Sequence, residues 1–186
     1  MNAIRAFIGI DFEDDCKRYI SVLQQSLRKY AVRGRWKHSD NFHLTLKFLD
    51  EIDAKQQKEI EEALRDICLR QEPFLLEVSE LGMFKGGDSI RVLWLGLTGD
   101  IMPLQSLAAD IERSLLPIGF PAERRPYTPH ITIGQDIVFE RPFEQVRASV
   151  GNISFGPMKT EKLTLLKSEQ IQNKRVYTKV SEFGLK

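Results

Sequence analysis

The sequence predicts an α+β fold in which helices pack against antiparallel or mixed sheets. Several segments carry apolar residues at every second position, which is typical of strands, and others carry them at steps of three and four, which is typical of helices. Strands follow one another directly in places, and no Gly-rich nucleotide loop or Gly-x-Ser-x-Gly elbow joins a strand to a helix. With 186 residues, the chain is expected to form one domain over residues 1–186.

The first half of the chain alternates between the two patterns. Residues 4–10 predict a strand buried on one face, with Phe7 among the residues on the other face. Residues 14–30 predict a helix, the pattern breaks over residues 32–38, and residues 42–48 predict a second strand. The remaining predicted elements are a helix capped by Asp53 and ending before Pro73, strands over 74–81 and 90–97, a helix after Asp100 that ends at Gly119, a short strand over 126–134, a short helix from Pro142, and strands near 152–155, 162–166 and 176–180.

Composition and charge indicate an ordinary folded protein. The net charge is only +1, whereas proteins that coat nucleic acid usually carry a strongly basic face, so an RNA substrate would be gripped only at a short end. No apolar run approaches the ~20 residues that cross a bilayer, and the first residues, Met1 to Ala6, lack the layout of a secretory signal. Cys16 and Cys68 lie far apart in helix-like segments and are expected to be buried thiols. We expect a monomer in the cytoplasm, without contact to a membrane.

Two of the three histidines occur in the same short motif. His43 is followed by Thr45 and His130 by Thr132, each pair on a predicted strand. Residues two apart on a strand face the same side, so each motif presents an imidazole and a hydroxyl together while the intervening apolar residues face the core. A single strand histidine is usually structural, but the same spacing at both sites indicates a shared function.

The sequence resembles the two-histidine phosphoesterase superfamily, and within it the LigT-like RNA 2′,3′-cyclic phosphodiesterases. Four stretches in this order carry the resemblance: RAFIGI at 5–10, NFHLTLKFL at 41–49, RVLWLG at 91–96 and PYTPHIT at 126–132. The resemblance implies two similar lobes with outer helices around a central cleft, to which each lobe contributes one His-x-Thr strand. It also implies that His43 is the proton donor and His130 the proton acceptor.

The chain departs from the family pattern in two places. Gln135 follows Gly134 where the family often has arginine, so a phosphate-holding role of that arginine does not carry over. The segment from Ser168 to Tyr177 follows the pattern only loosely, and no product contacts are carried over from it.

The predicted chemistry needs no cofactor. Opening a cyclic phosphodiester with water requires a base for the nucleophile and an acid for the departing ribose oxygen, and two imidazoles supply both near neutral pH. Thr45 and Thr132 would donate hydrogen bonds to the non-bridging phosphate oxygens as charge builds on them. The sequence has no spacing typical of a zinc or magnesium site, so no metal is expected.

Five further residues are candidates for substrate binding, each with a structural alternative. Lys47 is two residues after Thr45 and would attract phosphate or lie solvated at a sheet edge. Arg124 and Arg125 would meet the RNA backbone or serve loop solubility. Trp36 and Tyr127 would stack on a terminal base or pack at the rim of the core. The third histidine, His38, is expected at the surface.

The expected substrate is an RNA 3′ end with a 2′,3′-cyclic phosphate, such as a tRNA fragment, and the expected product is a 2′-phosphomonoester. Three alternatives stay open at this point. The same residues would serve an ATP-independent 2′–5′ RNA ligase, a non-catalytic binder of RNA ends, or an enzyme acting on a small cyclic phosphate.

Overall fold

The computed structural model describes residues 3–186; Met1 and Asn2, which open the segment considered above for a signal, lie outside them. The α+β prediction is confirmed, and every strand pairing described is antiparallel. The strands are β1 (Ile4–Asp11), β2 (Ala31–Trp36), β3 (His43–Ile52), β4 (Phe74–Lys85), β5 (Ile90–Gly99), β6 (His130–Phe139), β7 (Phe155–Thr160), β8 (Lys162–Ile171) and β9 (Lys174–Gly184). The helices are α1 (Asp14–Arg28), α2 (Ala54–Cys68), α3 (Ile101–Leu115) and α4 (Phe143–Val150), with short 3-10 turns η1 (Ser39–Asn41) and η2 (Leu116–Ile118).

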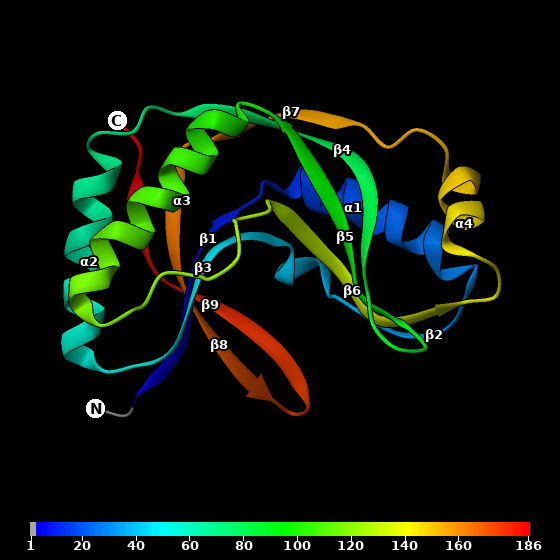
Figure 1. Cartoon of the computed structure of the whole chain (residues 1–186), viewed down its shortest axis with the longest axis horizontal. Coiled ribbons are helices and arrows are strands. Elements are labelled where there is room, and N and C mark those ends of the chain that lie inside the picture. Colours follow the sequence, from blue (N-terminus) through cyan, green and yellow to red (C-terminus); the bar gives the residue numbers. More distant parts are fainter. Residues whose placement is uncertain (1–2) are drawn as a thin grey trace.

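The sheet consists of two similar halves. Its strand order is β7-β4-β5-β6-β3-β1-β8-β9, with β2 paired to β6. The two halves join where β3 pairs with β6. From this junction outward, one half contains β3, β1, β8 and β9, and the other contains β6, β5, β4 and β7. The helices α2 and α3 cover the first half, whereas α1 and α4 lie on the second (Figure 1). Each half therefore brings one His-x-Thr strand to the junction.

The helices form where the sequence favours them. In α2, Asp53 accepts hydrogen bonds from the backbone of Lys55 and Gln56, and the Gln56 side chain returns a bond to the backbone of Asp53. This capping box satisfies amide groups that would otherwise lack partners at the start of the helix. The apolar stripes of α1, α2 and α3 are buried, as the periodicity predicts. None of the helices between Ala3 and Lys186 is both long and apolar enough to cross a membrane.

Four local expectations were wrong. The short strand expected over 126–134 is β6, which begins only at His130 and continues to Phe139. The segment expected to be irregular contains β2, an exposed strand that has no apolar alternation and forms because it pairs with β6. The strand expected near 152–155 is β7 over Phe155–Thr160, paired on one side to β4. Phe7 is only 2% exposed, because aromatic side chains of β3 and β9 cover the face of β1 that was expected to be open.

Candidate active site

The two His-x-Thr motifs meet where the halves of the sheet join. Leu44 of β3 pairs with Ile131 of β6 in antiparallel register. Both residues are fully buried, so the residues on either side of each face the opposite surface of the sheet. The four motif residues, His43, Thr45, His130 and Thr132, all line one open cleft of about 1120 Å³, hereafter the cleft.

The first histidine is fixed by two hydrogen bonds. His43 Nδ1 lies 2.8 Å from the backbone oxygen of Asn41, and His43 Nε2 lies 2.9 Å from Thr45 Oγ1. Because a carbonyl oxygen only accepts, Nδ1 carries the hydrogen, and Nε2 accepts from the Thr45 hydroxyl. Burial lowers the pKa of His43 to about 4, against the opposing effect of the Asn41 carbonyl. His43 is therefore neutral near pH 7 in the ligand-free protein.

The second histidine repeats this arrangement. His130 Nδ1 donates to the backbone oxygen of Thr128, two residues earlier, at 2.7 Å. The ring meets Phe84 edge-on, with centroids 5.3 Å apart, much as the His43 ring meets Tyr177 edge-on at 5.0 Å. In both motifs a carbonyl two residues back holds Nδ1, which leaves Nε2 as the nitrogen available for chemistry.

A bulge in β3 changes which side chains are exposed to the cleft. Gly9 of β1 pairs with Thr45, but the next residue back, Ile8, pairs with Lys47, so Leu46 is an extra residue. An extra residue reverses the alternation of faces beyond it. Lys47 is consequently buried, although it still borders the cleft, and Phe48 turns outward to the cleft, where it is 64% exposed.

The expected exposure of Lys47 was therefore wrong. Lys47 is 3% exposed. Its ammonium donates to both carboxylate oxygens of Glu112 and to the backbone oxygen of Pro121, each at 2.9 Å. The same carboxylate accepts from the backbone amide of Glu123 at 3.2 Å. Lys47 thus has no donor left for phosphate and anchors the segment that leads to the second motif.

Of the other predicted binding residues, some line the cleft and some do not. Arg125 lines the cleft, whereas Arg124 is exposed and does not line it. Tyr127 lines the cleft, but its hydroxyl donates to the backbone oxygen of Thr45 at 3.0 Å, and burial raises its pKa. Trp36 is not among the residues that line the cleft, and the Arg28 guanidinium lies 5.3 Å from its ring centroid.

Sequence reasoning missed several residues that line the cleft. These are Lys37, Phe48, Phe84, Arg91 and Tyr177. Gln135, at the position where arginine is frequent, also lines it. The alternation of apolar residues gave no signal for Lys37, which follows a strand that lacks this alternation, or for Phe48, which the bulge reorients.

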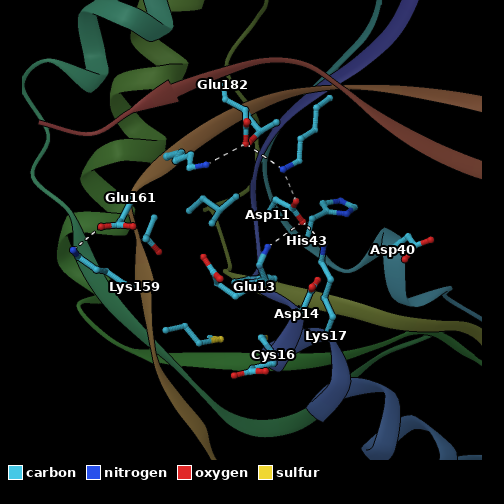
Figure 2. Close-up of a pocket in the computed structure, with 18 of the residues that line it drawn as sticks. Asp11, Glu13, Asp14, Cys16, Lys17, Asp40, His43, Lys159, Glu161 and Glu182 are labelled. Carbon is cyan, nitrogen blue, oxygen red and sulfur yellow. Dashed lines mark hydrogen bonds and ion pairs between the residues drawn. The ribbon is translucent and has the colours of Figure 1, made fainter.

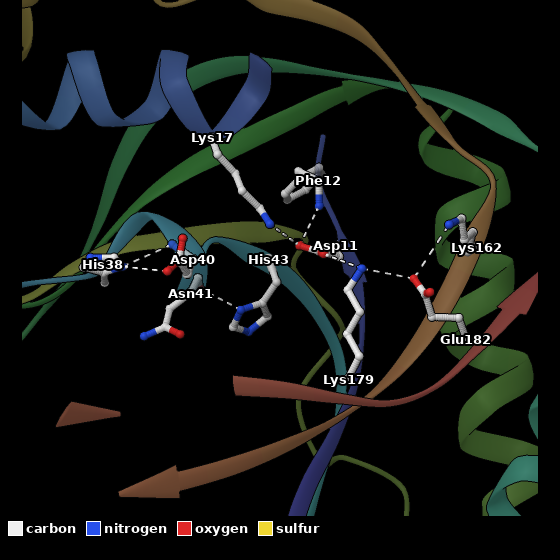
Figure 3. A network of polar contacts seen from close by, with 10 residues as sticks. All are labelled: Asp11, Phe12, Lys17, His38, Asp40, Asn41, His43, Lys162, Lys179 and Glu182. Atoms are coloured by element: carbon white, nitrogen blue, oxygen red, sulfur yellow. Dashed lines mark hydrogen bonds and ion pairs between the residues drawn. The ribbon is translucent and has the colours of Figure 1, made fainter. Parts of the chain in front are cut away.

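A second hollow of about 760 Å³ shares His43 and Tyr177 with the cleft, and we call it the side pocket (Figure 2). Its ion pairs centre on Asp11, which lies 2.7 Å from Lys17 and 3.0 Å from Lys179 (Figure 3). Burial alone would raise the pKa of Asp11, but the two lysines outweigh it and leave the pKa below its ordinary value. The network ties β9, and with it Tyr177, to β1 and α1.

The remaining candidate groups show no separate chemistry. Cys16 and Cys68 are buried and unpaired, as expected, and burial raises their pKa values to about 12 and about 11. His38 is exposed, as expected, and contacts Asp40. Over residues 3–186, the structure contains no cluster of three His, Cys, Asp or Glu side chains that would hold a metal ion.

The chain is similar in sequence and in fold to known proteins. The family model described as LigT like phosphoesterase matches residues 10–94 and 96–177. The RNA 2′,3′-cyclic phosphodiesterase of Methanothermobacter thermautotrophicus is 28% identical over 98% of this chain and 99% of its own, and that of Thermotoga maritima is 32% identical over 83% and 80%. A crystal structure of E. coli LigT complexed with 3′-AMP superposes with a TM-score of 0.82, at 26% identity and 98% coverage of both chains.

Proposed function

Since the chain belongs to the LigT-like phosphoesterase family, we propose that it hydrolyses RNA 2′,3′-cyclic phosphate ends to 2′-phosphomonoesters. The observation that carries this proposal is the paired geometry of His43 and His130. Two imidazoles on adjoining strands each offer Nε2 to one cleft, and each is fixed by a backbone carbonyl at Nδ1. Relatives that match nearly the whole chain are named RNA 2′,3′-cyclic phosphodiesterases.

The proposed reaction uses one histidine on each side of the phosphorus. His130 accepts a proton from water as the water oxygen bonds to phosphorus, and His43 donates a proton to the 3′ oxygen as its bond to phosphorus breaks. The product keeps the phosphate on the 2′ oxygen. Thr45 and Thr132 stabilise the additional negative charge on the non-bridging oxygens.

The donor role of His43 requires a proton that the ligand-free side chain does not hold at pH 7. A phosphodiester carries one negative charge, and an anion beside Nε2 raises the pKa of the imidazole. We therefore propose that His43 takes up its proton as the substrate binds. Thr45 then turns its hydroxyl from Nε2 to a phosphate oxygen.

The cleft suits the end of an RNA strand. Phe48 presents an exposed aromatic side chain on the same sheet face as Thr45, and Arg91 and Arg125 add positive charge along the cleft. Base stacking on an aromatic ring is tolerant of sequence, so any terminal base would be accepted. Fragments of tRNA are suitable substrates of this kind.

We also propose that the chain works as one domain, as a monomer and in the cytoplasm. The side chains that line the cleft come from both halves of the sheet, so neither half would hold a complete site. Two unpaired buried cysteines fit a reducing compartment.

A substrate panel tests the proposed specificity. We would compare a dinucleotide with a 2′,3′-cyclic phosphate end, a nucleoside 2′,3′-cyclic phosphate and a non-nucleotide five-membered cyclic phosphate. The dinucleotide should have the highest kcat/KM. A preference for the non-nucleotide compound would assign the protein to small-molecule metabolism.

A further inference from the structure

The side chain of Lys37 lines the cleft but, among the residues described, makes no ion pair that would stabilise the fold. The residue lies between β2 and η1, and its side chain lines the cleft beside His43 and Tyr177. The ammonium is 3.3 Å from the Tyr177 hydroxyl and 5.7 Å from the centroid of that ring. Within residues 3–186, no carboxylate lies at ion-pair distance from it.

The backbone of Lys37 is held rigidly against the second motif. Its amide donates to the backbone oxygen of Ile133 at 3.1 Å, one residue after Thr132. Gln24, which is 5% exposed, donates from one amide nitrogen to the Lys37 oxygen at 2.9 Å and to the Ile133 oxygen at 2.8 Å. These contacts use only the main chain of Lys37, so they fix the position of the residue while the side chain remains available.

Tyr177 directs the ammonium toward the first histidine. Its ring packs edge-on against His43 at 5.0 Å and against Phe7 at 5.0 Å. Lys37 thus bonds to the second motif through its main chain, and its ammonium contacts the ring that packs against His43.

The other basic residues of the cleft are placed differently. Lys47 is paired with Glu112, and Arg113 with Asp110. Arg91 and Arg125 are exposed side chains that make no hydrogen bond or ring contact with His43 or His130. Strand β6 brings Gln135 rather than a cation to the cleft.

We infer that Lys37 contacts the phosphate of the substrate next to His43 and stabilises its second negative charge as the ring opens. The inference rests on the proposed function, because it concerns that same site. A cyclic diester has one negative charge and the monoester product approaches two, so a fixed ammonium favours the transition state over the bound substrate.

The test compares Lys37→Met and Lys37→Arg with Arg33→Met. Arg33 is an exposed residue on the preceding strand and does not line the cleft, so its loss removes the same charge at a distance. Turnover of a dinucleotide cyclic phosphate is measured for each variant. Binding of inorganic phosphate is followed separately through the NMR signals of the histidines, which needs no turnover.

Lys37→Met should lower kcat by about ten- to a thousandfold, as for loss of one donor to developing charge. It should also weaken phosphate binding by about tenfold or more, the size expected for one charge-assisted hydrogen bond. Lys37→Arg should retain most of both properties, and Arg33→Met should match the wild type. If melting shows that Lys37→Met is unfolded, Lys37→Gln replaces it.

Three outcomes separate the inference from the proposed function. If Lys37→Met and Arg33→Met behave alike in both measurements, the inference is overturned. Loss of turnover with unchanged phosphate binding also overturns it, because the effect then arises from packing around Tyr177. If the wild type turns over no cyclic phosphate but Lys37→Met still weakens phosphate binding, the phosphate contact of Lys37 is upheld, whereas the proposed function and the role of Lys37 in ring opening both fail.

Discussion

Leu44 and Ile131 form the backbone pair that joins β3 to β6, and this pair brings the two His-x-Thr motifs side by side. Both side chains are fully buried beneath the junction. Extending the antiparallel register by one residue in each direction aligns His43 with Thr132 and Thr45 with His130. Each histidine therefore faces the threonine of the other motif, which suits two acid–base groups acting on one phosphate.

Thr45→Val should lower kcat by about ten- to a thousandfold, because it removes one hydrogen bond to developing charge while keeping the β-branched shape of the side chain. Steady-state kinetics on a dinucleotide cyclic phosphate gives the result. Thr98→Val on the exposed end of β5 is the matched control. An effect on KM alone would show that Thr45 only positions the substrate.

Phe48→Ala should raise KM for a dinucleotide substrate by about tenfold, since stacking one base on an aromatic ring contributes about 1–3 kcal/mol. The kcat should change little because Phe48 lies beyond the reacting atoms. Val32→Ala, at a similarly exposed apolar residue on β2, serves as control. Equal KM values for Phe48→Ala and the wild type would remove Phe48 from the substrate site.

NMR titration of the histidines should show one imidazole, His43, with a pKa near 4 in the ligand-free protein. Burial is the main cause, and the nearby Lys37 ammonium contributes, so Lys37→Met should raise this pKa. The pKa is lower than the ordinary value of 6.5, so the stabilising effect of a neutral His43 is complete above pH 6.5 and is lost as the pH falls toward 4. A titration midpoint at an ordinary histidine value would contradict the burial described here.

Lys47→Met should reduce the free energy of unfolding by about 3–5 kcal/mol, the usual effect of leaving one buried charge without its partner. The double variant Lys47→Met with Glu112→Leu should recover part of that loss. Urea denaturation measures both. Lys55→Met, which breaks an exposed ion pair with Glu59, should change stability by less than about 1 kcal/mol. A similarly small change for Lys47→Met would show that the interior pair is weak.

Much of the fold could be predicted because periodicity reports burial directly. The helices of residues 14–28, 54–68 and 101–115 follow apolar stripes, and the Asp53 cap marks the start of the second. Strand β2 could not be predicted in this way. Its four central residues are exposed, and its existence depends on hydrogen bonds to β6, about a hundred residues later in the chain.

The site could be predicted in part because the same short motif occurs twice in the sequence. The His-x-Thr repeat identified the four residues that share the cleft. The bulge at Leu46 could not be predicted from the alternation of apolar residues. Because of it, Lys47 is buried and Phe48 is exposed, the reverse of the expectation. Lys37 was missed for a different reason, since its position depends on Gln24 and Tyr177 from distant parts of the chain.

Phosphorus NMR of a dinucleotide 2′,3′-cyclic phosphate incubated with the protein in excess EDTA tests the central claim most directly. The wild type should give the 2′-phosphate alone, because His43 and His130 hold fixed places on either side of the phosphorus. His43→Ala and His130→Ala should each be slower by at least about a hundredfold, the usual contribution of one positioned acid or base. A mixture of 2′- and 3′-phosphates, loss of activity in EDTA, or full activity in either histidine variant would contradict the account.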